Sequence, residues 1–158
     1  MSRFDAQRTR RRLTLADIRL LGVVTMLEIV VAVGLRLLRL PALRGALLPV
    51  RPAAAWLAGA SERRLLWALD GTARRLPFAG NCLVRALVAD VILGASDPPM
   101  RVTIGVRRAD GKLEAHAWVE RDGRVVVGEA VASDASADAT FVPLLTWESS
   151  PARFSRAG

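Results

Sequence analysis

The chain has 158 residues, 52% of them hydrophobic, so it is long enough to bury the core of one domain. Its single cysteine excludes an intramolecular disulfide, which favours a reducing compartment, the cytoplasm, over a secreted fold. The net charge of +8 belongs to the N-terminal half, where residues 1–80 carry 14 Arg against 5 Asp and Glu. Because no aromatic-interleaved basic strand and no helix-turn-helix spacing accompany this charge, we expect no nucleic-acid partner.

The first 75 residues predict helices only. Residues 1–13 have no apolar period and are typical of a flexible basic arm. A capping-box-like pair, Thr14 and Asp17, then predicts a long helix that ends near Leu40 because Pro41 follows. Shorter helical pieces are expected over 42–48, 53–59 and 61–75, with proline or Ser61 at their starts.

The first of these helices is unusually apolar. Its apolar run, residues 20–35, is shorter than the ~20 residues of a membrane span and contains Glu28. We therefore expect a helix packed against protein, with peripheral membrane contact through residues 14–40 and a membrane span as the alternatives. Trp56 and Trp67 are expected to pack in the core rather than to form a substrate platform.

The second half predicts a nucleophile helix and a small sheet. Asn81 is a competent N-cap for a helix over residues 82–93. The period then changes to two, which predicts antiparallel strands near 101–107, 113–120, 124–128 and 141–147. We therefore expect an α+β fold with a papain- or transglutaminase-like core over 76–148, preceded by a helical segment over 14–75. Residues 133–140 are predicted to form a loop and 149–158 a disordered tail.

The only cysteine and the only histidine lie 34 positions apart, at the two ends of this pattern. Cys82 falls in the first turn of its helix, where the free N–H groups and the helix dipole stabilise a thiolate and can receive an oxyanion. His116 falls on the polar face of its strand, and we expect the Cys82 helix to cover that face. Together the two residues are typical of a cysteine hydrolase, with Cys82 as nucleophile and His116 as base. Taken singly, each is more often structural.

A third group would hold the imidazole in its working tautomer. A two-residue turn at Asp122 and Gly123 would put Glu129 opposite His116, whereas a three-residue turn would put Gly128 there and pair Glu120 with Arg124. The opposite-charge pair favours the second register. Glu129 is then the best third member, Asp122 is more typical of turn chemistry, and a dyad alone stays open. A zinc ion is usually held by about four ligands, and Cys82 and His116 would supply only two of them. We therefore expect no metal site.

Three blocks of sequence resemble one family. They are Gly80-Asn81-Cys82-Leu83-x-Arg85-Ala86-Leu87, Val102-x-Ile104-Gly105-Val106-Arg107 and Ala115-His116-Ala117-Trp118-Val119-Glu120-x-Asp122-Gly123-Arg124-Val125. Over roughly residues 76–128 the chain resembles the lasso-peptide leader peptidases, the transglutaminase-like proteins related to the microcin-processing maturation protease. The resemblance maps the nucleophile to Cys82 and the base to His116. It departs where the family has an aspartate, twelve residues after the histidine, because Gly128 stands there.

This resemblance implies a cysteine protease that removes the leader from a ribosomally synthesised precursor peptide. It implies three partners: the precursor, a leader-recognition protein and a cyclase that uses ATP, while no cofactor is expected in this chain. Asn81 and Trp118 are candidates for oxyanion or substrate binding. The alternatives are an acyl-transferring transglutaminase-like enzyme, a non-catalytic scaffold for precursor and cyclase, and a membrane-associated maturation subunit.

Overall fold

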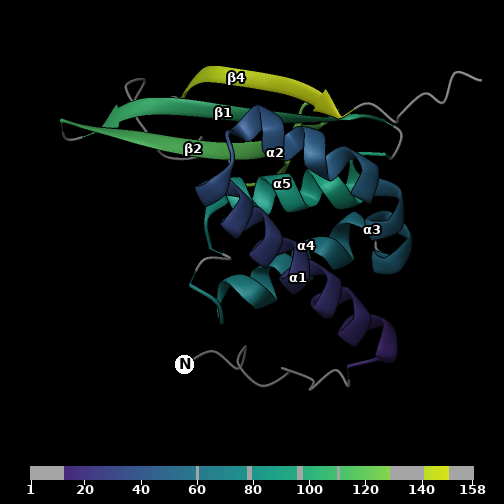
Figure 1. Ribbon diagram of the computed structural model, residues 1–158. Coiled ribbons are helices and arrows are strands. Elements are labelled where there is room, and N and C mark those ends of the chain that lie inside the picture. Colours follow the sequence, from purple (N-terminus) through teal and green to yellow (C-terminus); the bar gives the residue numbers. More distant parts are fainter. Residues whose placement is uncertain are drawn as a thin grey trace, which may run out of the picture.

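A computed structural model describes residues 13–59, 61–77, 80–95, 98–109, 111–128 and 141–149. A four-stranded sheet lies on one side of the molecule and the helices lie on the other (Figure 1). The expected α+β fold is confirmed, with a helix that begins at Cys82 packed on a small antiparallel sheet. The predicted arm up to residue 12, the predicted loop over 133–140 and residues 150–158 lie outside the described residues.

The first helix, α1 (Leu15–Leu37), begins where the sequence predicts. Thr14 and Asp17 form a full capping box, and the hydrogen bonds from the Thr14 backbone and side chain lower the pKa of Asp17 to about 2. The helix ends earlier than predicted, because Leu38 takes an extended conformation. Pro41 does not end α1. It lies in the first turn of the next helix, where its missing N–H costs no hydrogen bond.

Four further helical elements follow in the first half: α2 (Leu40–Leu47), a 3-10 turn η1 (Leu48–Val50), α3 (Arg51–Ala58) and α4 (Glu62–Ala73). Each of the first three has a proline in its first turn. Gly59 ends α3 in the left-handed conformation that suits glycine at a helix end. Ser61 stands at the N-cap of α4, but its side chain makes no capping hydrogen bond, so that detail of the prediction is wrong.

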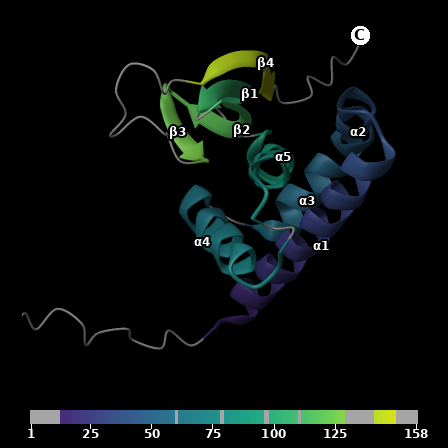
Figure 2. The same cartoon turned by 90° about the vertical axis from the view of Figure 1, so that its left-hand side faces the viewer.

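The helix α5 (Cys82–Leu93) is the centre of the molecule. It packs on the sheet with one side and on α1, α3 and α4 with the other, and Figure 2 shows it between the sheet and α1. The strands are β1 (Met100–Ala109), β2 (Lys112–Arg121), β3 (Arg124–Val127) and β4 (Val142–Ser149), in the order β3-β2-β1-β4. All neighbouring strands are antiparallel, as predicted.

The register of β2 and β3 differs from the predicted one. Arg121 pairs with Arg124, because Asp122 and Gly123 both have positive φ, 51° and 74°, and form the two-residue turn that suits a hairpin. The charge pairing of Glu120 with Arg124 therefore does not set the register. A bulge follows, after which Val119 pairs with Val127, so Gly128 comes to lie beside Trp118 and not opposite His116.

The core is one cluster that runs from α1 through α5 to the inner face of the sheet. Its largest fully buried side chains include Leu20, Leu65, Leu69, Leu87, Met100, Val102 and Val119. Trp56 and Trp67 are not among them. They are 76% and 42% exposed, so the prediction that both pack in the core is wrong. A helical-period stripe indicates that one side of a helix is buried, but not which residues at its borders are covered.

Candidate active site

Cys82 is the first residue of α5, as the sequence predicts. The Asn81 side-chain oxygen accepts hydrogen bonds from the N–H groups of Leu83 and Val84, at 2.9 and 3.4 Å. Asn81 is therefore a helix cap, and its amide NH₂ is its remaining donor. Within the described part of the chain no acceptor is bonded to the N–H of Cys82, so this group can receive an oxyanion.

The Cys82 side chain is half-buried and free, and it packs against the core cluster together with Leu83. The rest of α5 is almost wholly buried, from Val84 to Leu93 with the exception of half-buried Arg85. The helix is thus fixed by its packing, whereas its first turn is reached by solvent. A cysteine placed in this way is accessible to a substrate and lies on a rigid element.

His116 lies on the outer face of β2, opposite Gly105 of β1. Ala117 and Val119, its neighbours of opposite orientation, are 1% and 0% exposed in the core that α5 covers. Since strand side chains alternate, the predicted outward direction of His116 is confirmed. The expectation that the Cys82 helix covers that face is wrong, because α5 packs on the other one. Cys82 and His116 share no hydrogen bond in this structure.

Aromatic rings surround the imidazole. The ring centroid of His116 lies 6.2 Å from that of Trp118, with the planes 17° apart, and 5.3 Å from that of Phe141. Trp118 leans over Gly105, where a side chain would meet its ring at 2.9 Å. The Nε2 atom of His116 is buried and has no hydrogen-bond partner among the described residues. An imidazole nitrogen held free in this way is an available acceptor or donor.

No third group is assigned to His116 within the described residues. Gly128, where the resembled leader peptidases have an aspartate, has φ of 86°, and a side chain there would lie 2.9 Å from the Ala117 carbonyl oxygen and from Trp118. Asp122 is exposed in the hairpin turn. It follows His116 by six residues, which corresponds to roughly 20 Å along an extended strand. Glu129 lies outside the described residues. Glu114 shares the face of His116, but it accepts a hydrogen bond from Arg107 at 2.8 Å.

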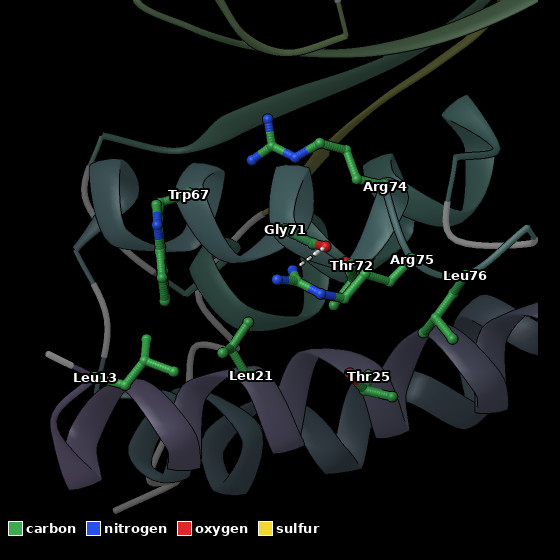
Figure 3. A pocket seen from close by; sticks show the side chains of 9 residues that line it. All are labelled: Leu13, Leu21, Thr25, Trp67, Gly71, Thr72, Arg74, Arg75 and Leu76. Atoms are coloured by element: carbon green, nitrogen blue, oxygen red, sulfur yellow. Dashed lines mark hydrogen bonds between the residues drawn. The ribbon is translucent and has the colours of Figure 1, made fainter. Parts of the chain in front are cut away.

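A groove of about 540 Å³ lies between α1 and α4, away from these residues (Figure 3). Leu13, Leu21 and Trp67 converge on it, and Arg75 lies across it, donating to the Gly71 carbonyl at 2.9 Å. Leu76 lies at one end of the groove and precedes Cys82 by six residues. The chain between these two residues can span roughly 20 Å at most. Its lining combines apolar side chains with Arg74 and Arg75.

Two buried polar clusters hold the helices and the sheet together, and sequence reasoning missed both. Arg51 of α3 donates to Asp90 of α5 at 2.5 Å, and Ser149 of β4 donates to the other oxygen of Asp90. Glu28 of α1 is 0% exposed and accepts a hydrogen bond from Thr72 of α4 at 2.8 Å. In the sequence Glu28 is recognisable as a charge within an apolar run. The hydrogen-bonded partners in these two clusters, however, lie 39 to 59 residues apart in the chain, so no local pattern connects them.

Burial raises the pKa of Glu28 from 4.5 to about 7, and its second oxygen has no partner in the described part of the chain. The folded state therefore loses stability as the pH rises from about 4.5 to about 7, because only the unfolded state ionises freely in that window. We expect Glu28→Gln to remove this loss and to gain up to roughly 3 kcal/mol over the wild type at pH 8. Urea denaturation at pH 5 and pH 8 measures it, with the exposed Glu114→Gln as control. Parallel pH dependence in all three proteins would contradict it.

The candidate ligands for a metal do not cluster. Among the described residues no group of three His, Cys, Asp or Glu side chains could hold a metal ion. Asp17 and Asp90 are occupied by arginines, and Glu28 by Thr72.

A helix that begins with a cysteine and packs on an antiparallel sheet is consistent with the papain- and transglutaminase-like class of α+β folds. A family model described as "Transglutaminase-like superfamily" matches residues 25–146. The chain belongs to the transglutaminase-like superfamily, and the match includes most of the helical segment as well as the sheet. Comparisons with curated proteins and with solved structures find no match. Membership is consistent with cysteine protease or acyl-transfer chemistry, and folds of this class are usually enzymes.

Proposed function

We propose that the chain is a cysteine protease that cleaves the leader from a ribosomally synthesised precursor peptide during lasso-peptide maturation. The observation that carries the proposal is Cys82 at the first position of α5, with no partner for its own N–H among the described residues, in a chain of the transglutaminase-like superfamily. The resemblance of the Cys82 and His116 blocks to leader peptidases supplies the substrate class.

The proposed reaction begins with attack of the Cys82 thiolate on the carbonyl carbon of the leader–core bond. The oxyanion that forms is received by the Cys82 N–H, and the amide of Asn81 is a second donor. His116 has taken the proton of the Cys82 thiol, and it gives this proton to the amine of the core peptide as the C–N bond breaks, which leaves the leader as a thioester on Cys82. Water, deprotonated by His116, then hydrolyses the thioester and frees the leader.

The reaction needs His116 and Cys82 within hydrogen-bond distance. In the free chain they lie on different sides of the sheet, so the dyad is proposed to form when the precursor and its recognition protein bind. Because Ala117 and Val119 face α5, this step requires a rearrangement of β2, a larger change than the tightening of a long catalytic hydrogen bond. The hairpin end of β1 and β2 beyond His116 is not covered by α5: Leu113 is 72% exposed and Ala115 is also exposed. Trp118, which stacks on the imidazole, is proposed to contact substrate.

Glu129 is the proposed third group, and a working dyad is the alternative. Position 128 does not provide the third group. Gly128 has no side chain, and its positive φ and the close contact with Ala117 and Trp118 leave no room for one. Asp122 would act only as a turn residue. No cofactor is proposed for this chain. The proposed partners are the precursor, a leader-recognition protein and a lasso cyclase that uses ATP, and the proposed location is the cytoplasm.

Two alternative functions would use part of the same site. A transglutaminase-like enzyme would pass the leader acyl group from Cys82 to an amine instead of to water. A scaffold would bind precursor and cyclase and leave Cys82 inert, and the separation of Cys82 from His116 in the free chain favours this second candidate.

The products distinguish the three functions. The chain is incubated with precursor, recognition protein and cyclase, and the peptides are followed by mass spectrometry. Free leader supports the protease, and an isopeptide-linked leader supports acyl transfer. An intact precursor that is retained by the chain supports the scaffold and contradicts both enzymes.

A further inference from the structure

One side of α1 is exposed along its whole length and is almost purely apolar. Successive residues turn by about 100° in a helix, which places the exposed apolar residues of α1 within an arc of about 120°. This set is called the α1 stripe: Leu15, Ile18, Gly22, Met26, Ile29, Val30, Val33 and Leu37, whose larger side chains are 46% to 86% exposed. A solvated helix face would carry polar groups there.

The other side of α1 is the one that packs on protein. It contacts α3, α4 and α5, and it buries both acidic residues of the helix, Asp17 and Glu28. By length and composition alone α1 could cross a membrane. However, 33% of the most apolar 18-residue stretch of this helix is buried inside the molecule. The helix is thus held by protein along one side, and the α1 stripe lies on its open side. This geometry suits a helix that lies on a surface.

The charges on this exposed side are all positive. Arg19 and Arg36 stand at the two ends of the α1 stripe, about 25 Å apart, and Arg39 follows. All three are exposed, and none has a carboxylate partner among the described residues. A second copy of the chain would place arginine beside arginine, because the exposed side of α1 offers no acid. The sequence before it adds Arg8, Arg10, Arg11 and Arg12.

We propose that the α1 stripe docks on an anionic lipid surface. Between Arg19 and Arg36 the stripe has no side chain that forms hydrogen bonds, whereas a protein interface carries about one hydrogen bond per 100–200 Å². Hydrocarbon satisfies such a stripe, and the arginines at its ends reach the phosphate layer. Because α5 lies between α1 and the sheet (Figure 2), the sheet would stay clear of the lipid surface.

Vesicle co-sedimentation of the full chain tests this proposal. Wild type is expected to bind vesicles that contain phosphatidylglycerol and to bind pure phosphatidylcholine more weakly. Met26→Glu with Val33→Glu should reduce the binding at least tenfold, since it places two charges in the lipid. Leu113→Glu with Leu144→Glu is the matched control: it makes the same change in net charge at exposed sites of the sheet and should bind within about twofold of wild type.

Arg19→Gln with Arg36→Gln should remove the preference for anionic lipid and keep the weaker binding to neutral vesicles. Circular dichroism checks that each variant is folded. Wild type that stays in the supernatant with both vesicles would overturn the proposal, as would equal losses in the two glutamate variants. A wild-type dimer that Met26→Glu with Val33→Glu converts to monomer would overturn it in favour of a second copy. Precursor cleavage without vesicles reports on the protease separately.

Discussion

Substituting Cys82 by Ala is expected to reduce cleavage of the cognate precursor by about 10³-fold or more, because no other thiol is present to form the acyl-enzyme. The fold should be unaffected, since Cys82 is only half-buried and alanine is the best helix former. Liquid chromatography with mass spectrometry measures the freed leader, and thermal unfolding measures the fold.

The matched variant for this prediction is Leu83→Ala, which shortens a neighbouring half-buried side chain of the same helix turn. It should lose some stability but retain most of its activity. His116→Ala should reduce cleavage by about 10²- to 10⁴-fold, the range for a general acid–base residue. Full activity in Cys82→Ala would contradict the protease and the acyl transferase together.

The second large effect concerns the buried pair of Arg51 and Asp90. Their side chains are 9% and 4% exposed, so removing one partner leaves a charge without compensation inside the protein. We expect Arg51→Met to destabilise the fold by about 3–5 kcal/mol. The pair joins α3 to α5, and Ser149 joins the same carboxylate to β4, so the loss should be global.

Urea denaturation measures this loss. The exposed pair of Arg101 and Glu148 offers the matched control, because its side chains are 56% and 60% exposed and Arg101→Met should cost at most about 1 kcal/mol. Arg51→Met combined with Asp90→Leu should recover much of the loss, since both charges are then absent. Equal effects of Arg51→Met and Arg101→Met would contradict the assignment of a buried pair.

Local signals in the sequence predicted the local parts of the site. The capping pair of Thr14 and Asp17 and the cap formed by Asn81 depend on residues two or three positions apart, and both were confirmed. The outward direction of His116 follows from strand alternation and was confirmed as well. The order of helix, hairpin and strands gave the α+β class for the same reason.

The tertiary arrangement could not be predicted in the same way. Which face of the sheet α5 covers depends on the joint packing of α1, α3 and α5, and alternation alone does not decide it. The hairpin register followed the positive φ of Asp122 and Gly123 and then a bulge, and the cross-strand charges did not overrule either. The exposure of Trp67 depends on the groove between α1 and α4, which no local pattern reveals.

The rate of Cys82 alkylation against pH tests the dyad most directly. The proposed dyad predicts that iodoacetamide labels the free chain with the same pH profile in wild type and in His116→Ala, because the two residues are apart. With precursor and recognition protein bound, wild type should react at a lower pH than His116→Ala does, because an imidazolium stabilises the thiolate. Identical profiles for the two proteins in the bound state would contradict the dyad.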